Sequence, residues 1–120
     1  MNTREDGNKG EDRAVSFLKA NGVDICERNY RIRSGEIDII GRDGSCLVFF
    51  EVKQRHHSGL ESAGAAVTKA KQKTICKVSD HYRLRCSVAS DTDIRYDVIV
   101  MDDDNIEWIK NAFDYQGRGF

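Results

Sequence analysis

Apolar and polar positions along the 120-residue chain repeat with two periods, one helical and one of strand type. A helical period over 9–21 places its apolar side chains on one stripe and ends at Gly22, a common C-terminal helix cap. A second helical period covers 62–84. Its predicted apolar stripe consists of Val67, Ala70, Thr74, Ile75, Val78 and Tyr82. Both segments are therefore predicted to be helices. Residues 1–8, which precede the first helix, are predicted to be a frayed start.

Five shorter segments have the composition of β-strands. They cover 23–33, 36–40, 46–52, 94–101 and 106–109. The first strand alternates loosely, which predicts a bulge at 27–29. The third is almost continuously apolar, as is typical of a central strand buried on both faces. A turn at 34–35 and a second at 42–45 join these strands, and we expect a positive φ at Gly44.

The order of these elements is helix, three strands, helix, two strands. The short turns predict that the first three strands form an antiparallel meander. The long second helix then allows the fourth strand to join parallel to the central strand, which leaves the last strand at the sheet edge. The chain length suits a single domain over 1–120.

Charge is abundant but balanced, since 32% of the residues are charged and the net charge is -1. The overall charge therefore does not indicate a nucleic-acid partner. One segment is strongly basic, because Asp80 is the only acid between Lys69 and Arg85. Lys69, Lys73 and Lys77 face away from the apolar stripe, with Lys71 at its edge. This face is expected either to contact phosphates or to be an ordinary solvated surface.

Cysteine spacing and apolar runs bear on the compartment. The four cysteines form no CxxC pair, which favours free thiols in a cytoplasmic protein over a disulfide framework or a metal finger. The longest apolar run, 46–50, is too short to span a bilayer, and the polar amino terminus lacks a signal peptide. We expect a cytoplasmic protein without a membrane partner.

Charged side chains interrupt two of the apolar strands. Glu36 and Asp38 are two residues apart, as are Glu51 and Lys53, so each pair shares one face of its strand. Counting outward from a turn at 43–44 places Asp38 opposite residue 49, and a register slip brings it to Glu51. Such charges are costly to desolvate unless they are paired or bind a metal. The cluster is therefore either a metal site or a structural ion pair.

Phosphodiester hydrolysis needs this combination of groups. The non-bridging oxygens must be neutralised, a water must be activated and the leaving alkoxide must be stabilised. Divalent ions held by carboxylates provide most of this, and a neighbouring lysine can orient or deprotonate the water. Asp38, followed thirteen residues later by Glu51-Val52-Lys53, has the corresponding form.

The Asp38 and Glu51-Val52-Lys53 pattern resembles the signature of the PD-(D/E)XK, or restriction-endonuclease-like, nucleases. The chain is still more similar to a bacterial family of small nuclease-like proteins of the YraN type, and the resemblance covers nearly its whole length. The motifs that carry it, in order, are Gly7/Gly10-Glu11, Asn29-Tyr30-Arg31, Gly35-Glu36-Ile37-Asp38, Val48-Phe49-Phe50-Glu51-Val52-Lys53-Gln54-Arg55, Val67-Thr68-Lys69-Ala70-Lys71-Gln72, Arg95-Tyr96-Asp97-Val98 and Ala112-Phe113. The superfamily's proline before the first acid is absent, because Ile37 occupies that position.

This resemblance implies an αβββαβ core with a mixed central sheet flanked by two helices. It implies that Asp38, Glu51, the Val52 carbonyl and Glu11 bind Mg²⁺ or Mn²⁺, and that Lys53 is the catalytic lysine. Glu11 is similar to the helix-borne acid of archaeal Holliday-junction resolvases, so branched or structured DNA is the expected substrate, with RNA as an alternative. A resolvase needs two active sites, which implies a homodimer.

Alternative interpretations stay open for the roles of several residues. Glu11 could instead satisfy amide donors in the first helical turn. Glu36 is expected to support the site, and Gln72 and Lys71 either face it or face solvent. The residues expected to contact nucleic acid are Arg31, Arg55, Lys69, Lys71 and Lys73. We expect His56 and His57 to be loop residues near the DNA, and Asp97 with Arg95 to be a structural pair.

A non-catalytic function is also compatible with these residues. On the same fold, the chain could be a nucleic-acid-binding adaptor that works with a DNA-processing partner such as a helicase. Metal binding by the carboxylates distinguishes the two functions.

Overall fold

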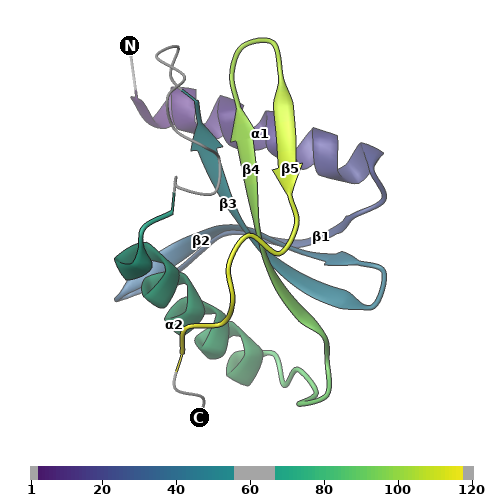
Figure 1. Ribbon diagram of the computed structural model, residues 1–120, viewed down its shortest axis with the longest axis vertical. Helices are drawn as coiled ribbons and strands as arrows, with labels where there is room; N and C mark the ends of the chain where they lie inside the picture. Colours follow the sequence, from purple (N-terminus) through teal and green to yellow (C-terminus); the bar gives the residue numbers. More distant parts are fainter. Residues whose placement is uncertain (1–2, 56–66, 118–120) are drawn as a thin grey trace.

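The computed structural model describes the chain over 3–55 and 67–117, with side chains from Gly10 onward. Its elements, labelled in Figure 1, are α1 (Thr3–Ala20), β1 (Asp24–Ile32), β2 (Gly35–Asp43), β3 (Cys46–Gln54), α2 (Lys69–Arg85), β4 (Ile94–Met101) and β5 (Ile106–Ile109). The last two strands have the predicted bounds, and β2 and β3 extend beyond theirs.

The five strands form one mixed sheet in the order β1-β2-β3-β4-β5. β1, β2 and β3 pair antiparallel, β4 joins β3 in parallel, and β5 returns antiparallel at the edge. A parallel neighbour requires a crossover, and α2 lies in that connection. The predicted mixed α/β architecture is confirmed, and it is consistent with a restriction-endonuclease-like core.

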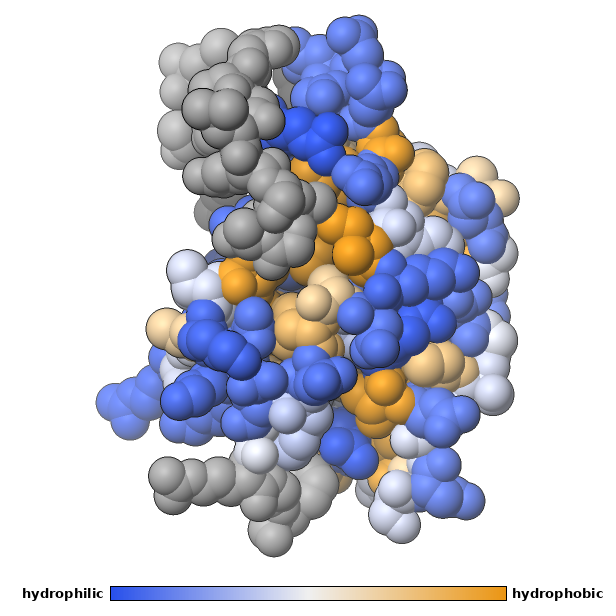
Figure 2. Space-filling model, in the orientation of Figure 1, coloured by the Kyte–Doolittle hydropathy of each residue, from blue (hydrophilic) through white to orange (hydrophobic). Residues whose placement is uncertain are grey.

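Each face of the sheet packs against one helix, as Figure 1 shows. The core on the α1 side contains Ala14, Val15, Leu18, Val23, Ile39, Val48, Phe50, Ile99 and Met101. The core on the α2 side contains Tyr30, Ile37, Ile40, Leu47, Phe49, Val67, Ile75, Cys76, Val78, Tyr82, Tyr96, Val98 and Val100. Because β3 contributes to both cores, its residues 47–50 are at most 1% exposed. Figure 2 shows hydrophilic side chains over much of the visible surface, with apolar residues gathered along its middle.

The sheet divides between β2 and β3. β1 and β2 remain paired as far as Ile32 and Gly35, whereas the last β2–β3 pair is Ile39 with Phe50. β3 and β4 remain paired to the end of β3. The two halves therefore diverge, and Figure 1 shows β1–β2 and β3–β5 running in different directions. We call the opening between 35–38 of β2 and 51–54 of β3 the β2–β3 fork.

Both helix starts differ from prediction. α1 begins at Thr3, so the frayed start predicted over 1–8 is wrong for the described residues from Thr3 onward. α2 begins at Lys69, because the Thr68 hydroxyl accepts a hydrogen bond from the Lys71 backbone and caps the helix. Residues 67–68 therefore precede the helix. The predicted segment 62–66 lies outside the described residues.

The stripe on α2 and the bulge in β1 are also corrected. Ala70 is exposed, while Cys76 and Ser79 are buried, because the helix faces the sheet slightly off the predicted direction. The bulge falls between Ile25 and Glu27 rather than at 27–29. The sequence pattern that predicted the bulge was weak, because β1 is mostly exposed and shows little alternation of apolar residues. The predicted positive φ at Gly44 is confirmed, at 64°.

Candidate functional site

Asp38 and Glu51 meet at the base of the β2–β3 fork. The β2–β3 turn consists of Gly44 and Ser45, because Asp43 pairs with Cys46. This turn lies one residue beyond the predicted one, so the expectation of residue 49 opposite Asp38 is wrong. Counting one step past the last pair, Ile39 with Phe50, brings Asp38 opposite Glu51.

Where β2 and β3 separate, a side-chain carboxylate replaces a backbone carbonyl as the hydrogen-bond acceptor for β3. The Val52 N–H donates to Asp38 Oδ2 at 2.8 Å. The N–H and C=O of one strand residue point toward the same neighbour. The Val52 carbonyl therefore also faces β2, beside the Asp38 carboxylate, which agrees with the third oxygen ligand implied by the nuclease resemblance.

The two carboxyls are poorly solvated. Glu51 is 8% exposed and Asp38 is partly buried. Burial raises the pKa of Asp38 to about 6, and neighbouring Glu11 and Glu36 also raise it, while the Val52 hydrogen bond lowers it. Burial, together with the charge of Asp38, raises the pKa of Glu51 to about 7. Two acids are thus held together in a position where ionising both is unfavourable.

Two lysines from different elements lie near Glu51. Lys53 comes from the same strand, and its positive charge lowers the Glu51 pKa. Lys71 comes from the first turn of α2, and its Nζ is 3.8 Å from Glu51 Oε1. The sequence signature indicated the first of these lysines, whereas the second was expected only as a nucleic-acid contact or a residue facing the site.

Glu11 reaches the same neighbourhood from α1. It is buried, and its Oε1 accepts hydrogen bonds from Arg28 Nε at 3.1 Å and Asn29 Nδ2 at 2.8 Å. Its negative charge contributes to the raised pKa of Asp38. Glu11 is therefore near the pair, with one oxygen engaged by two β1 side chains.

The carboxylates of Asp38 and Glu51 are chemically suited to bind a divalent cation. Carboxylate oxygens are preferred ligands of Mg²⁺ and Mn²⁺, and a cation relieves the repulsion between two poorly solvated acids. Within 10–55 and 67–117, no group of three or more His, Cys, Asp or Glu side chains is arranged to hold a metal. The candidate ligand set in the described chain is therefore Asp38, Glu51 and the Val52 carbonyl, with Glu11 nearby and its Oε1 engaged by Arg28 and Asn29.

The two residues expected to support the site have defined contacts. Glu36 Oε2 accepts from Arg31 Nη2 at 3.0 Å, and its charge raises the pKa of both Asp38 and Glu51. Gln72 Nε2 donates to the Val67 carbonyl at 3.1 Å. Glu36 thus adds negative charge at the fork. Gln72 connects α2 by a hydrogen bond to the segment that precedes it.

The expected nucleic-acid contacts are dispersed. Lys69 and Lys73 are exposed on α2, while Lys71 lies in the fork. Arg31 pairs with Glu36, and Arg55 pairs with Glu107 of β5 at 2.6 Å. His56 and His57 lie outside the described residues.

Asp97 forms a structural network away from the fork. It is fully buried and accepts hydrogen bonds from Arg95, from Trp108 Nε1 at 2.8 Å and from the Asn111 N–H at 2.8 Å. Arg95 also pairs with Asp43 beside the β2–β3 turn. The network ties β4 to β5 and to the turn, in agreement with the predicted structural pair.

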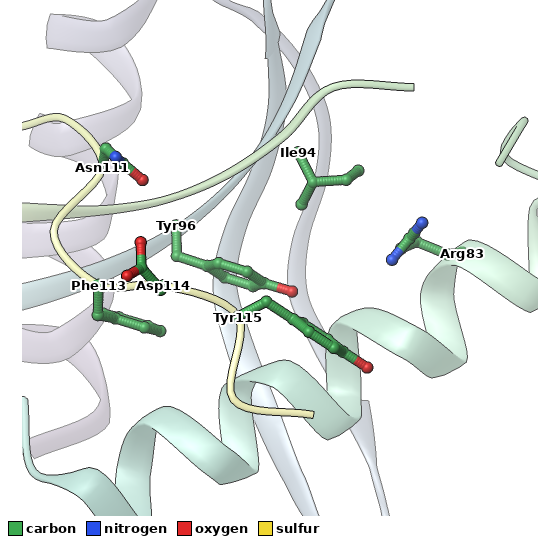
Figure 3. A pocket seen from close by; sticks show the side chains of 7 residues that line it. All are labelled: Arg83, Ile94, Tyr96, Asn111, Phe113, Asp114 and Tyr115. Carbon is green, nitrogen blue, oxygen red and sulfur yellow. The ribbon is translucent and has the colours of Figure 1, made fainter. Parts of the chain in front are cut away.

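A pocket of about 170 Å³ lies near the opposite end of α2 from Lys71. Figure 3 shows its aromatic side chains, Tyr96 from β4 and Phe113 and Tyr115 from the C-terminal segment. The other lining residues are Arg83, Ile94, Asn111 and Asp114. The pocket lacks a carboxylate pair, so we assign the candidate site to the fork.

Sequence reasoning missed the residues that hold Glu11. Asn29 adopts a φ of 52°, a conformation that asparagine tolerates better than most residues. An asparagine between Arg28 and Tyr30, inside a segment predicted as a strand, was the available signal. Arg28 carried no signal of its own, since its partners Glu11 and Asp12 are distant in sequence.

Comparison with known proteins places this site in a family. The model of the family described as "Uncharacterised protein family UPF0102" matches residues 10–101, which include every member of the fork. The chain belongs to the UPF0102 family. A UPF0102 protein of Dechloromonas aromatica (strain RCB) is 46% identical over 107 residues, covering 89% of this chain and 87% of the relative.

Other UPF0102 proteins match over similar lengths. One from Legionella pneumophila (strain Corby) is 40% identical over 93% of this chain and 97% of its own. One from Nitrosospira multiformis is 39% identical over 95% of this chain and 97% of its own. In the part of this UPF0102 chain that the structure describes, no helix is both long and apolar enough to cross a membrane.

Proposed function

We propose that this UPF0102 protein is a metal-dependent nuclease that hydrolyses phosphodiester bonds in DNA, with branched or structured DNA as its substrate. The observation that carries the proposal is the opposed Asp38 and Glu51 pair at the β2–β3 fork, with Lys53 beside it. A buried acid and a partly buried acid, both of raised pKa, form a costly arrangement for a purely structural ion pair.

The residues of the fork divide the chemistry between them. Asp38, Glu51 and the Val52 carbonyl would hold Mg²⁺ or Mn²⁺, which neutralises the phosphate and acidifies water when bound. Lys53, whose positive charge acts on Glu51, orients the attacking water. Glu11 maintains the local negative charge from α1, and Glu36 supports it from β2.

Lysines on α2 supply affinity for the nucleic-acid backbone. Lys69 and Lys73 are exposed within the first turns of α2, the same turns that carry Lys71 to the fork. Contacts of this type carry no base specificity. With a net charge of -1, the protein is expected to bind DNA weakly and with strong dependence on salt. Action on a branched substrate would require two sites, supplied by a homodimer.

The proposal is tested by cleavage of labelled four-way-junction, duplex and single-stranded DNA, and of matched RNA, in Mn²⁺. Wild type is compared with Asp38→Asn, Lys53→Ala and Lys19→Ala, the last an exposed lysine of α1 remote in sequence from the fork. We expect cleavage by wild type and Lys19→Ala, and a loss of at least about 100-fold in the other two variants. Wild-type activity no greater than that of Lys53→Ala contradicts the proposal.

A second function has its own support. Glu11 Oε1 is engaged by Arg28 and Asn29, and no described group of three acids, histidines or cysteines is arranged as a metal site. These observations support a non-catalytic function, for which a nucleic-acid-binding adaptor is the candidate and a DNA-processing helicase its proposed partner. Calorimetry with Mn²⁺ separates the two functions. A nuclease binds Mn²⁺ in wild type and loses that binding in Asp38→Asn, whereas an adaptor shows no binding in either.

A further inference from the structure

Lys71 is placed at the fork by its backbone. The Thr68 hydroxyl accepts from the Lys71 N–H at 3.1 Å, and the Thr68 carbonyl accepts from the Gln72 N–H at 2.9 Å. The Gln72 side chain adds a bond to the Val67 carbonyl. These bonds fix the first turn of α2, so the Lys71 side chain begins from a defined point and reaches toward β3.

The Lys71 side chain lies between the buried acid and solvent. Its side chain is 42% exposed, whereas that of Glu51 is 9% exposed. The Nζ–Oε1 distance of 3.8 Å makes this an ion pair that lacks the shorter separation of a charge-assisted hydrogen bond. The ammonium therefore balances the Glu51 charge through a loose contact that can be exchanged.

The surrounding charges indicate a role for the Lys71–Glu51 ion pair. Asp38 and Glu36 lie near Glu51, and the described cations that act on Glu51 are Lys53 and Lys71. Without a metal, this acidic cluster repels a phosphate. A lysine at the mouth of the fork compensates part of that charge, and its exposed ammonium is also accessible to an incoming phosphate.

We propose that Lys71 is a built-in counter-ion that holds Glu51 in the metal-free protein and turns to the substrate phosphate when the site is loaded. The inference rests on the proposed function and gives a positioning role to a residue outside the nuclease signature. Lys71 then competes with a divalent cation for Glu51, and it contacts nucleic acid only after that competition is lost.

The first test measures Mn²⁺ affinity by calorimetry. Lys71→Gln removes the competing charge, so we expect Mn²⁺ to bind roughly tenfold more tightly, as the loss of one charge at this distance implies in a partly exposed site. Lys73→Gln removes the same charge from an exposed position of the same helix and is expected to stay within about twofold of wild type. Lys71→Arg keeps the charge and is expected to resemble wild type.

The second test measures binding of a labelled four-way junction in EDTA and in Ca²⁺, over a range of salt concentrations. Lys71→Gln is expected to match wild type in EDTA and to reduce the salt slope by about 1 in Ca²⁺, which is one phosphate contact. Lys73→Gln is expected to have the same effect in both conditions. Equal effects of Lys71→Gln in EDTA and Ca²⁺ overturn the exchange of partners.

The outcomes separate this inference from the proposed function. If wild type binds Mn²⁺ and Lys71→Gln binds it with equal or lower affinity, the counter-ion role is overturned and the metal site stands. If neither protein binds Mn²⁺, the metal site and the counter-ion role both fail. Far-UV circular dichroism and urea denaturation of Lys71→Gln verify that the variant folds, and Lys71→Met, which also removes the charge, takes its place if it does not.

Discussion

Replacing Asp38 by asparagine should stabilise the protein at alkaline pH. The pKa of Asp38 is raised from its ordinary 3.8 to about 6, and that of Glu51 from 4.5 to about 7. The folded state therefore binds more protons than the unfolded state between about pH 4 and pH 7. Because stability falls with pH wherever the folded state binds more protons, these two acids destabilise the protein as pH rises through that range.

The structure gives the size of this effect. A difference of one unit between the folded and unfolded pKa of a group corresponds to about 1.4 kcal/mol. Ionising Asp38 therefore lowers the free energy of unfolding by at most about 3 kcal/mol. Water reaches the partly buried side chain, which reduces this to about 2 kcal/mol. Asparagine keeps the acceptor for the Val52 N–H but carries no charge. Asp38→Asn should match wild type near pH 3.5, below the unfolded pKa of Asp38, and exceed its stability by about 2 kcal/mol at pH 8.

Urea denaturation of wild type and Asp38→Asn at half-unit steps from pH 3.5 to pH 8.5 measures the difference. Asp103→Asn is the matched control, because Asp103 is exposed on the β4–β5 turn. Its stability should follow that of wild type at every pH. An Asp38→Asn protein that is no more stable than wild type at pH 8 would refute the argument, since the acids would then lack the burial and repulsion on which the candidate site rests.

Three further positions test the packing of the fold that carries the fork, each by urea denaturation. Asp97→Ala should lose about 3–5 kcal/mol, because it removes the fully buried acceptor that the Arg95 guanidinium, the Trp108 indole N–H and the Asn111 N–H share; a loss below 1 kcal/mol contradicts this. Gly35→Ala should lose about 1–3 kcal/mol, since the new Cβ lies 2.4 Å from Thr74 Cγ2. Thr74→Ser removes that methyl group and should restore most of the loss, and failure to do so places the clash elsewhere. Tyr96→Phe should lose about 1 kcal/mol with its buried bond to Ser79, and an unchanged midpoint would show that the bond contributes nothing.

Much of the fold could be predicted from the sequence because the relevant signals are local. The bounds of β4 and β5 follow from short apolar runs between polar turns, and both match the prediction. Gly44 indicated the turn because glycine adopts a positive φ without strain. The parallel pairing of β3 with β4 followed from the long helix between them. The charged positions of β2 and β3 marked the candidate site for the same reason, since acids are rare in apolar strands.

The β2–β3 register could not be predicted in this way. A one-residue shift normally exchanges buried and exposed side chains, which fixes the register. Residues 47–50 are all apolar and buried, so β3 buries its side chains equally well in neighbouring registers. The turn at Gly44 and Ser45 decided the matter and brought Asp38 opposite Glu51.

The sequence by itself therefore determined the type and order of the elements and indicated the acids of the candidate site, because each depends on neighbours along the chain. Only the tertiary structure decided which charges meet. Glu11 reaches the fork on α1 and is held by Asn29 of β1, while Lys71 reaches it from the first turn of α2. Close packing of Gly35 against Thr74 sets the approach of that helix. No periodicity along the chain encodes these distances, because they arise from packing between segments that are remote in sequence.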